Sequence, residues 1–89
     1  MLDEITVKFL SPGCKLLESK AFSVELMAID GECEIFPMHA NAFFQLGTGR
    51  LVLKQGTTSH KYTVHGGVAK FTDNELLVLS EKIVPEIKN

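Results

Sequence analysis

The sequence has little positive charge and no long hydrophobic run. Its 89 residues carry nine lysines and arginines against eleven aspartates and glutamates, mixed along the chain. A nucleic-acid-binding domain usually shows a basic stripe, and a helix that binds a membrane surface usually shows a basic face. No apolar stretch approaches the ~20 residues that span a bilayer. We therefore expect no nucleic-acid partner and no membrane-spanning segment.

Cysteine is also scarce, because the chain contains only Cys14 and Cys33. Two cysteines cannot build a disulfide scaffold, and reduced thiols are the rule in a cytosol. Asp3 and Glu4 stand where a secretory signal needs cations, and no hydrophobic signal region follows. We expect the protein to stay in the compartment where it is made.

What the sequence does contain is a repeated alternation of apolar and polar residues. This period of two, with β-branched and aromatic residues, predicts strands at residues 5–9, 22–29, 51–54, 62–64 and 77–79. Glycine, proline, asparagine and aspartate separate the runs every 8 to 12 residues. The nearest candidate for a helix, residues 14–21, does not keep a 3.6-residue period. The pattern predicts one all-β domain over residues 1–89, a sandwich or a barrel.

Several of these runs are apolar on their second side as well. Met27, Ile29, Val52 and Val78 stand on the side opposite the main apolar residues. Either both faces of those strands are covered, or one face is a docking surface.

The residue types that carry catalysis or bind metals do not form a convincing site. His39, His60 and His65 are spaced by 21 and 5 residues, and the last two would point to opposite faces of a regular strand. Surface or interface histidines are the simpler interpretation. Cys33 lies between Glu32 and Glu34, which raise a thiol pKa and oppose nucleophilic catalysis.

The alternating acids Asp30, Glu32 and Glu34 would share one face of a strand. Such a cluster could bind Ca²⁺ or serve acid–base chemistry, but a solvated edge explains it more simply. The pairs Gly47-x-Gly49 and Gly66-Gly67 are too short to cradle a phosphate. They are typical of turns in which glycine accepts a positive φ. We therefore expect no active site, no cofactor and no metal.

One segment, residues 30–40 (DGECEIFPMHA), resembles the G-E-x-G-[IV]-[FY]-P-G-H-A segment of the ε subunit of F-type rotary ATP synthases, called δ in mitochondria. Further similarities follow in the same order: Phe9-Leu10-Ser11-Pro12 at the end of the first strand, Gly49-Arg50-Leu51-Val52, and Tyr62 before Gly66-Gly67. The resemblance covers roughly residues 5–81.

The resemblance implies a flattened two-sheet β-sandwich of about ten mostly antiparallel strands. It implies a non-catalytic rotor subunit of a proton-translocating synthase, on the cytoplasmic face of the bacterial inner membrane. One side of the domain would bind the γ subunit, and loops at one end would touch the c-ring. Ring rotation would then reach the catalytic α/β hexamer as torque. Isolated, the chain would be a monomer.

The resemblance also assigns roles to single residues. It implies γ contacts at Ser11, Met38, His39 and Phe44. It implies that Glu32 faces the c-ring, with Asp30 and Gly31 in the same turn, because arginine in the ring loops offers the carboxylate a partner. Pro37, Gly49, Gly66 and Gly67 would form structural turns.

The chain departs from the family pattern in two positions and in length. Glu34 replaces a small residue, and Met38 replaces the glycine before His39. We expect an ordinary backbone at Met38, whose side chain adds apolar contact area. Many members continue into a C-terminal helical hairpin, which can bind ATP or block hydrolysis. We expect neither property here, whether the chain is naturally short or truncated.

Two rival interpretations remain at this point. One is a β-sandwich protein-binding module unrelated to the synthase, which must explain the joint spacing of these motifs by chance. The other is a small enzyme or metal-binding barrel, which needs histidines that converge on one cavity.

Overall fold

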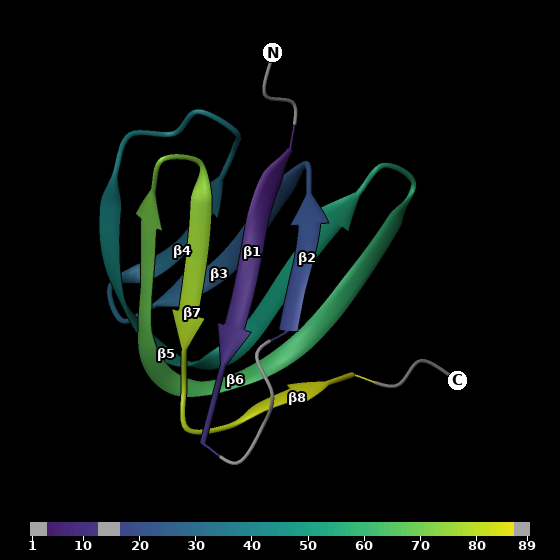
Figure 1. Ribbon diagram of the computed structural model, residues 1–89. Helices are drawn as coiled ribbons and strands as arrows, with labels where there is room; N and C mark the ends of the chain where they lie inside the picture. Colours follow the sequence, from purple (N-terminus) through teal and green to yellow (C-terminus); the bar gives the residue numbers. More distant parts are fainter. Residues whose placement is uncertain (1–3, 13–16, 87–89) are drawn as a thin grey trace.

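The fold consists of β-strands and turns. The computed structural model describes residues 4–12 and 17–86, and this part of the chain contains eight strands and no helix (Figure 1). The strands are β1 (Ile5–Leu10), β2 (Leu17–Ala21), β3 (Ser23–Ala28), β4 (Gly31–Ile35), β5 (Ala42–Gln55), β6 (Thr58–Thr72), β7 (Glu75–Leu79) and β8 (Ile83–Pro85).

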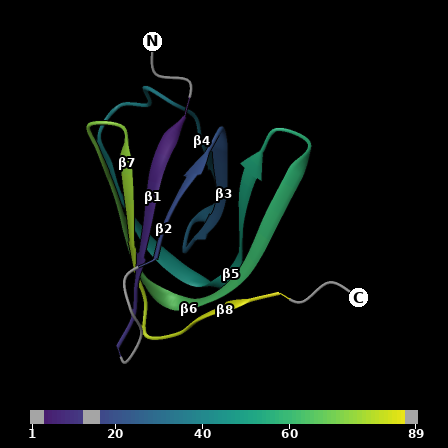
Figure 2. The same ribbon diagram turned by 45° about the vertical axis from the view of Figure 1, so that its right-hand side comes forward.

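The strands form one hydrogen-bonded sheet in the order β2-β1-β7-β6-β5-β3-β4, with β8 added to β6. All neighbouring pairs are antiparallel except β1 and β7, which are parallel. Figure 2 shows that β5 and β6 curve together into a U, with β1 and β7 beside one arm. The sheet therefore folds over on itself into two layers.

The bend of the U has a cause in the register. Between the pairs Glu25–Val52 and Ala28–Leu46, β3 advances by three residues and β5 by six, so part of β5 loops out. On β6 the bend falls at Gly66 and Gly67, which both have positive φ. Extra residues in one strand bend a sheet in this way. Because β5 and β6 contribute an arm to each layer, eight strands fill the place of the ten that we expected.

The core lies between the layers. Alternate residues of β1, β3 and β7 point inward, including Val7, Leu26 and Val78, and all three are buried. Phe71 is the largest side chain that is fully buried. The period-two pattern thus predicted the buried face of β1 and β3. It chose the wrong face of β7, because Leu76 and Val78 are buried while Leu79 is exposed.

The apolar residues that the sequence places on the second side of the strands have different environments. Met27 packs over Gly49, Ile29 is exposed in a turn, and Val52 is covered. These residues therefore do not form one docking face.

Candidate partner-binding surfaces

The loop between β4 and β5 carries two of the residues that the sequence assigned to γ. It forms a corner with the β6–β7 turn, which we call the Met38 corner: residues 36–41 together with Asp73 and Asn74. The Met38 amide donates a hydrogen bond to Asn74 Oδ1 at 3.0 Å, and the Asp73 amide donates to Asn41 Oδ1 at 3.2 Å. Asn74 Nδ2 donates to the Glu4 carbonyl at 2.6 Å. The start of β1 is thereby joined to the same corner.

The expectation of an ordinary backbone at Met38 is wrong. Its φ is +67°, in the left-handed region, and its side chain is 69% exposed. The hydrogen bond to Asn74 fixes the amide in that orientation. Pro37 lies in the turn before it, as predicted.

His39 is exposed on the same corner. Its amide donates to the Phe36 carbonyl at 3.1 Å, and its Nδ1 lies 2.6 Å from the Ala40 carbonyl oxygen. The ring meets the buried Phe71 ring edge-on, with 5.8 Å between centroids. His39 is therefore held by its neighbours and presents one side to solvent.

The acidic turn between β3 and β4 lines a groove with the beginning of β5. Asp30, Gly31 and Glu32 line it together with the exposed Phe43 and with Phe44, which packs partly against the core. The Ile29 amide donates to the Gln45 carbonyl at 2.9 Å and ties the turn to β5. The structure thus brings Phe44, assigned to γ, beside the residues assigned to the c-ring. Both assignments stay predictions.

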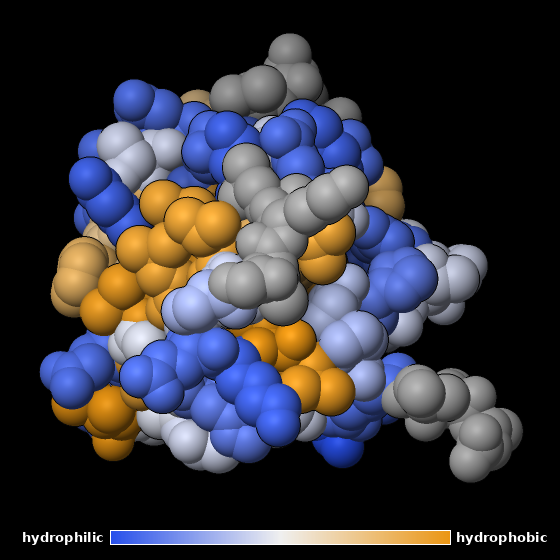
Figure 3. Space-filling view, turned by 60° about the horizontal axis from the view of Figure 1, so that its bottom comes forward, coloured by the Kyte–Doolittle hydropathy of each residue, from blue (hydrophilic) through white to orange (hydrophobic). Residues whose placement is uncertain are grey.

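Ser11 lies beyond the end of β1, away from the Met38 corner. It follows β1, whose six residues span roughly 20 Å, while the Met38 corner adjoins the start of that strand. Only 8% of Ser11 is exposed, so it offers little surface to a partner. It lines an apolar hollow with Leu10, Gly67 and Leu79. Figure 3 shows apolar surface gathered at this end of the molecule.

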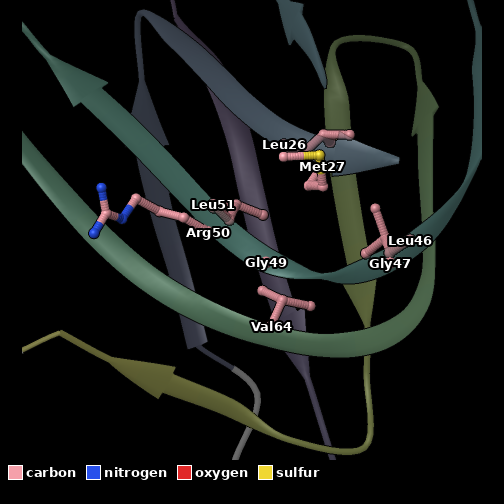
Figure 4. Close-up of a pocket in the computed structure, with 8 residues that line it drawn as sticks. All are labelled: Leu26, Met27, Leu46, Gly47, Gly49, Arg50, Leu51 and Val64. Atoms are coloured by element: carbon pink, nitrogen blue, oxygen red, sulfur yellow. The ribbon is translucent and has the colours of Figure 1, made fainter. Parts of the chain in front are cut away.

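The glycines that we expected in turns lie in strands. Gly49 is inside β5 and has no positive φ, so its assignment to a turn is wrong. A Cβ there would stand 3.0 Å from Met27 Cβ, so Gly49 allows β3 to pack closely on β5. Figure 4 shows this region, with Arg50 pointing away from the buried Leu51 and Val64. Gly66 and Gly67 do have positive φ, but in the bend of β6.

The acids on β3 and β4 form an ion cluster with Lys54, which we call the Lys54 cluster. Lys54 Nζ lies 2.9 Å from Glu25 Oε2 and 3.1 Å from Glu34 Oε2, and Ser23 Oγ donates to Glu34 at 2.8 Å. The Ser23 hydroxyl and the Lys54 ammonium lower the pKa of the Glu34 carboxyl. Glu34 thus joins three strands, which gives this departure from the family pattern a structural role.

Cys33 does not have the environment of a nucleophile. Burial raises the pKa of its thiol, with a smaller contribution from Asp30. We expected the adjacent Glu32 and Glu34 to raise this pKa. In the strand register, however, they pair with Met27 and Glu25. Cys33 pairs with the buried Leu26. The other cysteine, Cys14, lies outside the described residues.

Within residues 4–12 and 17–86, no three His, Cys, Asp or Glu side chains gather as a metal site. His60 and His65 lie on β6 and His39 on the Met38 corner. No helix in the described part of the chain is long and apolar enough to cross a membrane.

Asn41 and Asn74 are the site residues that sequence reasoning missed. The turn at residues 73 and 74 agrees with the expectation that asparagine and aspartate separate the strands. No spacing in the sequence, however, predicts that the Asn41 side chain bonds a residue 32 positions away, or that the Asn74 side chain bonds one 36 positions away.

These features define a β-sandwich domain that exposes apolar and acidic side chains at the Met38 corner and at the β3–β4 turn. A family model for the β-sandwich domain of the ATP synthase delta/epsilon chain matches residues 4–86. The chain therefore belongs to this family, and the unrelated module and the metal-binding barrel are set aside.

Relatives agree with this assignment. The ATP synthase epsilon chain of Maridesulfovibrio salexigens is 30% identical over 81 residues, which cover 91% of this chain and 57% of the relative. That of Nitratidesulfovibrio vulgaris is 31% identical over 81 residues, covering 91% and 60%. The chain thus spans less than two thirds of the length of either relative.

Solved structures show the same fold. A chain of the mitochondrial ATP synthase of Euglena gracilis (OSCP/F1/c-ring) superposes with a TM-score of 0.88 at 19% identity, over 99% of this chain and 58% of the other. A chain of the central stalk and c-ring of the Tetrahymena thermophila mitochondrial enzyme gives 0.75 at 15%, over 89% and 64%.

Proposed function

We propose that this chain is a non-catalytic central-stalk subunit of a proton-translocating F-type ATP synthase. It links γ to the membrane c-ring, so that rotation of the ring drives ATP synthesis in the α/β hexamer. The observation that carries the proposal is the family match over residues 4–86. The solved assemblies that share the fold include a central stalk and c-ring, which supports the same role.

In this role the chain has no active site of its own and binds no cofactor. It reaches the cytoplasmic face of the bacterial inner membrane through the complex. Its function lies in two contacts that must hold at the same time, one to γ and one to the ring.

The contacts divide between two surfaces. The Met38 corner, with His39, faces γ. The turn with Asp30, Gly31 and Glu32 faces the c-ring, where the exposed Phe43 adds apolar area to the carboxylates. Phe44, which the resemblance assigns to γ, lines the same groove and packs partly against the core. Ser11 is buried, so it supports the end of β1 and contributes little direct contact.

Calorimetric titration of the cognate γ subunit tests the division of surfaces. The wild-type chain should bind γ saturably in a 1:1 ratio. His39→Asp should weaken binding at least about tenfold, because it places a charge where the complex excludes water. Glu32→Lys should change γ affinity less than about twofold but should reduce binding to membranes that carry the c-ring, since it reverses a charge.

Each result has a definite meaning. If the folded wild-type chain does not bind γ, the proposed function is wrong. If Glu32→Lys weakens γ binding as much as His39→Asp does, the synthase role stands but the two surfaces are assigned incorrectly. Circular dichroism of each variant shows whether it has folded.

A further inference from the structure

Backbone strain gathers at one place in the described residues. The three residues other than glycine with positive φ are Met38, Asp73 and Asn74, at +67°, +50° and +64°. All three belong to the Met38 corner, and the Met38–Asn74 hydrogen bond joins two of them. Asn and Asp accept left-handed backbone through local hydrogen bonds, but methionine does so at a cost.

The corner itself imposes this conformation. Asn74 accepts from the Met38 amide and donates to the Glu4 carbonyl, while its own carbonyl accepts from the Thr6 amide at 3.2 Å. Asn41 holds the adjoining Asp73 amide. The turn is therefore tied to β1 and to the β6–β7 turn.

The strain is not offset by burial within the chain. Met38 is 69% exposed and Phe36, two residues earlier, is 54% exposed. A glycine would accept this φ without strain. Strained residues held by rigid surroundings cluster at ligand and partner sites, where preorganisation lowers the entropy cost of binding.

We propose that the turn of residues 36–39 is a preorganised docking knob, with Met38 as its specificity-determining residue and Asn74 as its positioning residue. The partner is a protein surface with an apolar socket that admits the unbranched Met38 side chain beside Phe36. Glu4 and Asp73 are exposed on the same corner. They require a neutral or basic rim around the socket, and they oppose an anionic lipid surface.

This inference rests on the proposed function, which makes γ the partner. It adds to that function a claim specific to this chain: its methionine contributes affinity at a cost in stability. The flexible Met38 side chain can fill an irregular socket. A γ subunit whose own side chains already fill that socket would bind this chain weakly.

The Met38→Gly variant tests this inference, because its expected effects on stability and on γ affinity have opposite signs. The melting temperature should rise, because glycine relieves the strain. Affinity for the cognate γ subunit, measured by calorimetry, should fall at least about tenfold, because the apolar side chain is lost. Met38→Leu is the control and should bind within about threefold of the wild type, since it keeps the apolar volume.

Asn74→Gly tests the positioning role. Glycine accepts the φ of +64°, so this variant removes the amide hydrogen bonds without adding strain. It should weaken γ binding, and the double variant Met38→Gly/Asn74→Gly should bind like Met38→Gly alone, because the amide acts only through the knob. Additive losses would mean that Asn74 merely stabilises the fold, and would overturn its role.

The failures can be told apart. A wild-type chain that does not bind γ overturns the proposed function and this inference with it. A wild-type chain that binds γ, with Met38→Gly binding equally well, overturns the knob and leaves the proposed function standing.

Discussion

Gly67 shows how strictly a single position can be specified in this fold. Its φ is +109°, and a Cβ there would lie 2.0 Å from the Leu79 carbonyl oxygen and 2.9 Å from Ser80 Cα. Both neighbours are backbone and cannot rotate away. The bend of β6 thus presses against the end of β7, and only glycine fits between them.

We predict that Gly67→Ala lowers the free energy of unfolding by about 3 kcal/mol or more, through steric overlap and backbone strain. The matched control is Gly47→Ala in the same bend, where no atom lies within 4 Å of the added Cβ and φ is not positive. It should change stability by less than about 1 kcal/mol. Urea denaturation gives both values, and equal midpoints would contradict the steric argument.

For single residues, the sequence predicted some backbone conformations and missed others. The positive φ of Gly66 and Gly67 was expected, whereas that of Met38 was not, because a methionine gives no sign of left-handed backbone. The pKa of the Cys33 thiol is raised, as expected, but its main cause is burial and not the adjacent carboxylates Glu32 and Glu34. Residues that are adjacent in a strand point to opposite faces of the sheet. Adjacency in the sequence therefore does not mean that two side chains are in contact.

Among the elements, the Lys54 cluster connects β3, β4 and β5 by charge as well as by backbone hydrogen bonds. Glu25, Glu34 and Lys54 come from the three strands in turn. The two carboxylates raise the pKa of the Lys54 ammonium. Such exposed pairs contribute only modestly to stability, because water screens them.

The cluster predicts a pH dependence with a definite sign. The folded state lowers the pKa of Glu34 below its ordinary value of 4.5, so the folded protein binds this proton less readily than the unfolded chain does. The stabilisation is therefore present above that value and is lost as pH falls further. Wild type should melt above Glu34→Gln at pH 7, and the difference should shrink as pH falls below 4.5.

Thermal melts at several pH values check this prediction. Glu18→Gln, an exposed carboxylate on β2 outside the cluster, controls for the loss of one negative charge. A difference between wild type and Glu34→Gln that stays constant down to pH 3 would show that the interaction of Glu34 with Ser23 and Lys54 does not depend on its charge.

The strands themselves were predicted unevenly. Residues 5–9 alternate cleanly and form β1, because one side of that strand faces the core. β2 was missed, since it is an edge strand whose residues are mostly exposed and show no alternation. β5 and β6 were expected as short separate strands, because the glycines of a bend look like the glycines of a turn.

For the whole molecule, the distribution of apolar surface predicts the state of the isolated chain. The exposed apolar residues do not form one face: some lie at the Met38 corner, the groove beside Phe43 and the hollow beside Leu79, and Leu17, Phe22 and Val84 lie elsewhere. The acidic edge strand β4 also discourages pairing with a second copy. None of these areas resembles the large apolar face of an obligate dimer.

We therefore predict a monomer of 9.8 kDa at micromolar concentration, which analytical ultracentrifugation measures directly. A concentration-independent dimer would contradict this and would mean that one of the three surfaces is already occupied in solution. The Met38→Gly and Phe43→Ser variants would then show which one.

The parallel pairing of β1 with β7 has a consequence for how the protein is made. β1 needs residues 75–79 as its neighbour, so a nascent chain leaves the ribosome with its first strand unpaired on that side until those residues have been made. Throughout that time Ile5, Val7 and Phe9, which are buried in the folded protein, stay open to solvent and to other chains. Translation speed and chaperone supply thereby decide the yield of folded protein.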